Sequence, residues 1–104
     1  MTAALVWCPF ADEDSAAAVA AALLDEGLVT CANIVPGVRS LFIWRGQRED
    51  AREAGALFKT SGALLPRAIA RIEALHPYDQ PAVLGWHCDA ANPATLDWVG
   101  GLPG

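Results

Sequence analysis

Hydrophobic and polar residues follow one another along this chain with two periods, one typical of helices and the other of strands. Apolar positions recur at helical spacing in Ala16–Leu24, directly after the carboxylates of Asp12-Glu13-Asp14, which suit the positive end of a helix. We therefore predict a helix over residues 12–26. The same spacing predicts a second helix over residues 64–76, where Pro77 prevents its continuation.

The segments between and around these helices are rich in β-branched, aromatic and other apolar residues, as strands are. The longest of them is interrupted at Pro36-Gly37, so we expect a kink there. Arg45-Gly46 predicts a tight turn into a return strand of similar length. At about 3.3 Å per residue this hairpin spans about 40 Å and overhangs the helices. The predicted strands are residues 4–8, 30–44, the return strand ending at Thr60, and 82–88.

The order of these elements, β-α-β-β-α-β, predicts the ferredoxin-like fold, in which two helices cover one face of an antiparallel sheet. A short helix over residues 94–99 follows, and residues 100–104, which are rich in glycine, are expected to fray. The 104 residues suit one domain, residues 1–104, with no linker or low-complexity segment.

Both faces of the predicted strands are apolar, although the helices can cover only one. Phe42 and Trp44 point to one side while Leu41 and Ile43 point to the other, whereas a half-exposed strand alternates with polar residues. The chain is 54% hydrophobic and only 18% charged. We therefore expect copies of the chain to cover the second face. The alternative is that the terminal helix and loops cover it.

Charge and cysteine content exclude several classes of function. The net charge is −5, and the seven Lys and Arg residues form no stripe, so nucleic acid is not expected as a partner. Three cysteines without a CxxC motif argue against a disulfide framework or a zinc finger. The start of the chain lacks the basic region of a signal peptide, and no apolar run could span a membrane. We expect a soluble cytoplasmic protein with no membrane contact.

Several segments together resemble the CutA family, the divalent-cation tolerance proteins. The resemblance is carried, in the family's order and spacing, by Leu28–Ser40, Trp44-Arg45-Gly46, Phe58-Lys59-Thr60, His76-Pro77-Tyr78-Asp79 and Leu96-Asp97-Trp98. It implies a homotrimer whose sheets pack inward and whose hairpins extend across neighbouring subunits. It also implies an architecture like that of the PII signalling trimers, no enzymatic activity, and a link to copper and other divalent ions.

The resemblance further implies metal ligands at Cys8 and His76, to which Asp79 could add an oxygen. Thiolate and imidazole are ligands that copper favours. The set is depleted, because Leu75 stands where some members have a second histidine. Each residue also has a structural interpretation: Cys8 as an inert core thiol, and His76 as the stabilising end of a helix or part of a rigid connection.

A second possibility is a small-molecule effector bound in a cleft between subunits, as in PII-like proteins. Asn33, Trp44, Lys59 and Tyr78 are the candidate lining residues, and the Lys with amide and phenol groups would suit an anion. The structural alternatives are a backbone-bonding role for Asn33 and a core or interface position for Trp44. The charged arm that holds Glu49, Asp50 and Glu53 is interpreted as solvated.

An enzyme of the acylphosphatase type, which shares this fold, is the weakest hypothesis. Such an enzyme needs a phosphate-binding loop after the first strand, but residues 9–14 here are acidic and repel phosphate. We therefore expect no catalytic residues.

Overall fold

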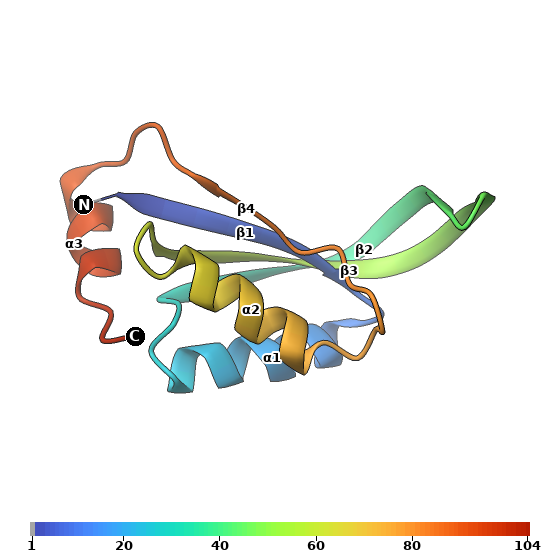
Figure 1. The fold of residues 1–104 in the computed structure, drawn as a ribbon, viewed down its shortest axis with the longest axis horizontal. Helices are drawn as coiled ribbons and strands as arrows, with labels where there is room; N and C mark the ends of the chain where they lie inside the picture. Colours follow the sequence, from blue (N-terminus) through green and yellow to red (C-terminus); the bar gives the residue numbers. More distant parts are fainter. Residues whose placement is uncertain (1) are drawn as a thin grey trace.

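The computed structural model describes residues 2–104, which form a four-stranded antiparallel sheet with two helices on one face and a third at one end (Figure 1). The sheet order is β2-β3-β1-β4. This confirms the ferredoxin-like βαββαβ prediction with its extra terminal helix. The elements are β1 (Ala3–Phe10), α1 (Glu13–Asp25), β2 (Cys31–Trp44), β3 (Gln47–Ser61), α2 (Leu65–Leu75), β4 (Leu84–His87) and α3 (Pro93–Gly100).

Helix α1 begins where the carboxylates predicted it would. Asp12 is the N-cap, and its side chain accepts a hydrogen bond of 2.7 Å from the backbone N–H of Ser15. That bond stabilises the ionised form and lowers the pKa of Asp12. Asn92 caps α3 in the same way through the N–H of Thr95. No helix of residues 2–104 is long and apolar enough to cross a membrane.

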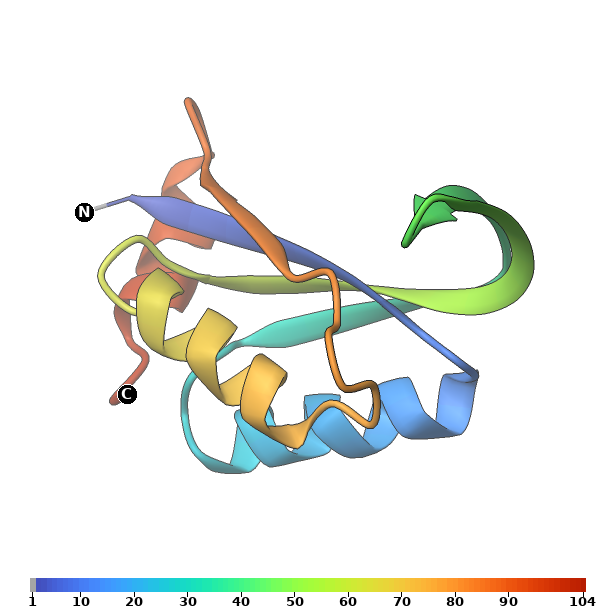
Figure 2. The ribbon, with the colours of Figure 1, turned by 45° about the vertical axis from the view of Figure 1, so that its right-hand side comes forward.

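The hairpin of β2 and β3 is the longest feature of the molecule and gives it an extent of 43 Å. Its pairing shifts register between Val35 and Val38, which confirms the predicted kink. At the turn Arg45 and Gly46 both have positive φ, of 51° and 77°, as a two-residue turn matched to strand twist requires. The hairpin passes beyond the helices and then curls back (Figures 1 and 2).

The hydrophobic core lies between the sheet and helices α1 and α2. Strand register places alternate residues of β1 and β3 on this helix-covered face, where they are buried. The core side chains of the sheet include Val6, Cys8, Phe10, Ala56 and Phe58.

The opposite side of the sheet, here called the outer face, carries Leu5, Trp7, Leu57, Leu84 and Trp86. Leu84 and Trp86 are 64% and 46% exposed. Trp7 lies across Gly55 so closely that a Cβ there would sit 2.0 Å from the indole. Helix α3 packs on β1 and β3 but leaves Leu84 and Trp86 uncovered. The chain therefore does not cover its own outer face.

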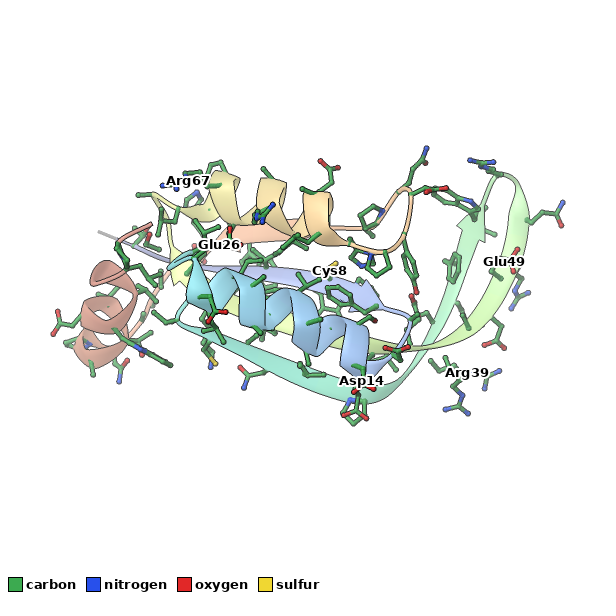
Figure 3. All side chains as sticks on the ribbon, turned by 90° about the horizontal axis from the view of Figure 1, so that it is seen from below. Cys8, Asp14, Glu26, Arg39, Glu49 and Arg67 are labelled. Carbon is green, nitrogen blue, oxygen red and sulfur yellow. The ribbon has the colours of Figure 1, made fainter. Side chains whose placement is uncertain are left out.

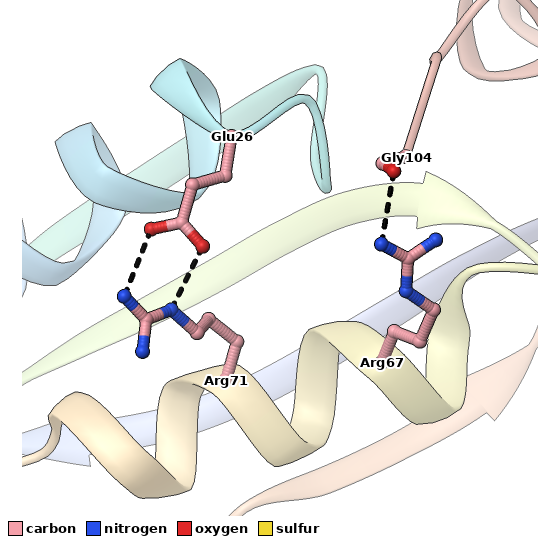
Figure 4. Close-up of polar contacts among 4 residues, drawn as sticks. All are labelled: Glu26, Arg67, Arg71 and Gly104. Atoms are coloured by element: carbon pink, nitrogen blue, oxygen red, sulfur yellow. Dashed lines mark hydrogen bonds and ion pairs between the residues drawn. The ribbon is translucent and has the colours of Figure 1, made fainter.

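The tail that was expected to fray is instead tied to the body of the fold. The N–H of Gly104 donates to the carbonyl of Gly27, and Arg67 of α2 donates to the carbonyl of Gly104 at 2.9 Å (Figure 4). Beside it Arg71 pairs with Glu26 at 2.8 Å and links α2 to the end of α1. The sequence did not reveal these contacts because their partners lie far apart along the chain.

Candidate functional site at the root of the hairpin

His76, which follows α2, is buried, and both of its ring nitrogens are hydrogen bonded. The Nδ1 atom accepts a bond of 3.0 Å from the backbone N–H of Tyr78. Nδ1 therefore carries no proton, and Nε2 donates to the carbonyl of Pro9 at 2.8 Å. The network thus assigns the neutral ring with its proton on Nε2.

These contacts fasten three parts of the fold together, and we call the group the His76 clasp: Pro9, Phe10, Glu53, His76 and Tyr78. The imidazole stacks on Phe10, with centroids 4.3 Å apart, and meets the ring of Tyr78 at 4.7 Å. The hydroxyl of Tyr78 donates to Glu53 of β3 at 2.7 Å. Burial, together with this bond and the carboxylate's charge, raises the pKa of Tyr78. The clasp holds the end of β1, the end of α2 and the root of the hairpin.

Cys8 lies on the helix-covered face and is fully buried (Figure 3). Burial, with a smaller contribution from the charge of Glu53, raises the pKa of Cys8 to about 12. At neutral pH the thiol therefore keeps its proton. Metals bind the thiolate rather than the thiol.

The three predicted metal ligands are therefore only partly brought together. The Sγ of Cys8 lies 3.6 Å from the carbonyl oxygen of Pro9, the same oxygen that His76 contacts. Yet burial keeps the proton on the thiol, and both imidazole nitrogens are hydrogen bonded, so a copper ion at this pair would have to displace that proton and one of the two hydrogen bonds. Asp79 is exposed on the neighbouring loop. Within residues 2–104 no three His, Cys, Asp or Glu side chains gather in a way that could hold a metal.

Next to the clasp lies a cavity of about 760 Å³, within the size range of small-molecule sites. We call it the hairpin cavity, because the curled hairpin forms one wall and the loop after α2 the other. Trp44 and Tyr78, both predicted for a ligand cleft, line it. The lining residues are Pro9, Ser40, Phe42, Ile43, Trp44, Arg45, Glu53, Tyr78, Asp79, Gln80 and Ala82.

Asn33 and Lys59, the other two residues predicted for the cleft, do not line this cavity. Both lie on the outer face, where Asn33 is paired with Leu57 and Lys59 with Leu5. Within one chain, the predicted grouping of lysine, amide and phenol for an anion is therefore not formed. The charged groups that do line the cavity are Glu53, Asp79 and Arg45.

Glu53 is partly buried rather than a fully solvated member of the hairpin arm. Its carboxylate accepts the Tyr78 hydroxyl and lines the cavity, whereas Glu49 and Asp50 are exposed as expected. Glu53 is the last charged residue before the apolar stretch Ala54–Phe58. That position, at the boundary between exposed arm and core, is the one sign in the sequence of its role.

Fold and site together define a small ferredoxin-like α/β protein with a projecting hairpin and an uncovered apolar sheet face. The chain matches the family model described as CutA1 divalent ion tolerance protein over residues 4–101. The chain belongs to this CutA1 family. Comparison with individual proteins agrees with the match.

The divalent-cation tolerance protein CutA of Thermus thermophilus is 37% identical to this chain, over 84% of each. The mouse protein CutA is 31% identical over 95% of this chain, which spans 55% of the mouse protein. Among solved structures, the CutA of Archaeoglobus fulgidus, described as a periplasmic divalent cation tolerance protein, superposes with a TM-score of 0.88. It is 26% identical and covers 94% of this chain and 95% of its own.

Proposed function

We propose that this chain acts in divalent-cation tolerance as a non-enzymatic homotrimer that binds copper or another divalent ion weakly. The observation that carries the proposal is the outer face, where Leu84 and Trp86 are exposed beside Trp7 on a sheet whose other face is already filled. An apolar surface of this kind on a soluble protein marks an interaction site. A second and third copy of the chain supply the simplest cover.

Weak binding follows from the state of the candidate ligands. The Cys8 thiol keeps its proton, and a metal at His76 would have to replace one of two hydrogen bonds. Asp79 is exposed, and the net charge of −5 attracts cations in general. The names of the relatives support a role with divalent cations, and the family's names include no enzymatic activity.

Assembly is tested by sedimentation at micromolar concentration. The proposal expects a particle of three times the 10.9 kDa chain mass. A soluble particle of one chain mass would refute the trimer.

Metal binding is tested by anaerobic titration with Cu(I) and Cu(II) of the natural chain and of the Cys8→Ala, His76→Ala and Asp79→Asn variants. Cys31→Ala is the matched control for thiol binding outside the proposed site, because Cys31 is partly exposed. The proposal expects weaker binding in at least one of the three variants and no change in the control. Equal affinity in all of them would remove the metal site.

The hairpin cavity favours a second candidate function, a PII-like regulatory or scaffold trimer with a small-molecule effector. Its volume and its mixed apolar and charged lining are typical of effector sites, and the hydrogen bonds of the clasp fasten Tyr78 and Glu53 at its floor. Thermal-shift screening of metabolites tests it, since a ligand at 100 times its Kd adds about 2.7 kcal/mol of stability.

We place either function in the cytoplasm, and fractionation of the native cell tests that placement, because the relative from Archaeoglobus fulgidus is described as periplasmic.

A further inference from the structure

The side chains that line the hairpin cavity limit the class of ligand that the cavity can bind. Two aromatic side chains, Phe42 and Trp44, form its apolar wall and are 40% and 43% exposed. Glu53 and Asp79 bring carboxylates to the lining, against the single cation of Arg45. An aromatic wall beside carboxylates is a combination that recognises organic cations, through ring faces and charge together.

The cavity already contains one contact between a cation and an aromatic ring, formed by the chain itself. The guanidinium carbon of Arg45 lies over the ring of Trp44, 5.6 Å from its centroid. Arg45 belongs to the exposed turn at the tip of the hairpin, so its side chain can leave the ring without disturbing the core. The chain thus places its own flat cation on the surface that a ligand would use.

The electrostatics at the floor of the cavity agree with this assignment. The hydroxyl of Tyr78 donates to Glu53, and burial first, then this bond and the charge of Glu53, raise the pKa of Tyr78. The two carboxylates of the lining, Glu53 and Asp79, against the one cation of Arg45, favour a cationic ligand and disfavour an anion.

We propose that the hairpin cavity binds a flat organic cation of the amidinium, guanidinium or aromatic-amine class, which replaces Arg45 on Trp44 and faces Glu53 and Asp79. This inference rests on the second candidate function, a cavity for an effector, and adds the class of ligand. It does not depend on the binding of a metal.

Benzamidine and benzoate are suitable probes, because both are flat rings of similar size and carry opposite charges. Calorimetric titration of the natural assembly is expected to give saturable binding of benzamidine and none of benzoate. In parallel, the indole N–H resonance of Trp44, assigned by its loss in Trp44→Leu, is expected to shift with benzamidine.

Two variants separate the contributions of the aromatic ring and of the carboxylate to the affinity for benzamidine. Trp44→Leu keeps an apolar wall but removes the ring and should weaken benzamidine binding about fivefold. Glu53→Gln should weaken it by a similar factor, whereas the control Glu49→Gln removes the same charge from an exposed hairpin position outside the lining.

Arg45→Asn provides the sharpest test, because it removes the internal cation and suits the positive φ of that position. Its affinity for benzamidine should increase more than that of the control Arg48→Asn, which also loses one hairpin cation.

Benzoate binding as tight as benzamidine, or equal effects of Glu53→Gln and Glu49→Gln, would overturn the ligand class and leave the cavity as a site for another effector. Absence of binding by both probes, together with dissociation of the assembly in Trp44→Leu, would mean that a neighbouring copy fills the cavity. That result would overturn both the inference and the second candidate function.

Discussion

The two faces of the sheet differ in how completely the side chains of a single chain are buried. On the helix-covered face, Phe10 and Phe58 are fully buried and the polar groups of His76 are all bonded. On the outer face, Leu84 and Trp86 are large, apolar and open to solvent. The first face is filled by the chain's own side chains, whereas a single chain leaves the second uncovered. Substitutions on the two faces should therefore affect different measurements.

The largest expected effect is on assembly. Leu84→Asp places a charge on the part of the outer face formed by the edge strand β4 and should reduce the sedimenting mass from the proposed three chains to one, because an unpaired charge is not tolerated in an apolar interface. Leu24→Asp is the matched control, since Leu24 is 45% exposed on α1 and faces away from the sheet. If both variants sediment like the natural protein, the outer face is not the interface.

Next in size is the effect of the core on folding, measured by urea unfolding in the Leu84→Asp background so that assembly does not contribute. Phe58→Ala should lower the free energy of unfolding by about 3–5 kcal/mol, because it leaves a cavity among buried neighbours. Phe42→Ala on the exposed hairpin should change it by less than about 0.5 kcal/mol in the same background. Equal losses would contradict the contrast between the two regions.

A smaller loss is expected at the clasp. His76→Phe keeps a ring against Phe10 but leaves the Pro9 carbonyl and the Tyr78 N–H without their partner, which should cost about 1–3 kcal/mol. His87→Phe, at an exposed position of β4, provides the comparison and should be nearly neutral. A neutral His76→Phe would show that these bonds do not hold the loop.

The smallest expected effect is a decrease of the free energy of unfolding at alkaline pH. Folding raises the pKa of Cys8 from 9.0 to about 12, so the folded chain keeps a proton that the unfolded chain releases. The contribution of the Cys8 thiol to the stability of the fold is complete below pH 9 and is lost as the pH rises toward 12. At pH 10 the loss is about 1.4 kcal/mol. Unfolding under reducing conditions at pH 8 and pH 10 should show this loss in the Cys31→Ala control but not in Cys8→Ala.

The secondary structure could be predicted from the sequence because each element has a local signal. Helical spacing marked α1 and α2, and Pro36-Gly37 marked the kink in β2. The strand predicted over residues 82–88 is shorter, Leu84–His87, because pairing with β1 ends where Leu84 meets Trp7. That boundary depends on the partner strand rather than on local composition.

The site was less predictable because it depends on contacts between distant segments. His76 reaches a carbonyl 67 residues away, and Tyr78 reaches a carboxylate 25 residues away. The sequence identified His76 and Cys8 as candidates, but not the bonds and burial that occupy the imidazole and keep the thiol protonated. Glu53 resembled its exposed neighbours because the curl of the hairpin, which brings it to Tyr78, leaves no local trace in the sequence.

The close approach of Trp7 to Gly55 has a consequence for the shape of the molecule. Since Gly55 has no side chain, the six-membered ring of the Trp7 indole occupies the space that a Cβ at this position would take. At Gly55 the outer face therefore carries one ring in place of a ring and a second side chain, which suits the spacing of about 10 Å at which sheets usually stack. Even a methyl group at this position would force the indole to move on the outer face, whereas the helix-covered side of the sheet has no contact with it.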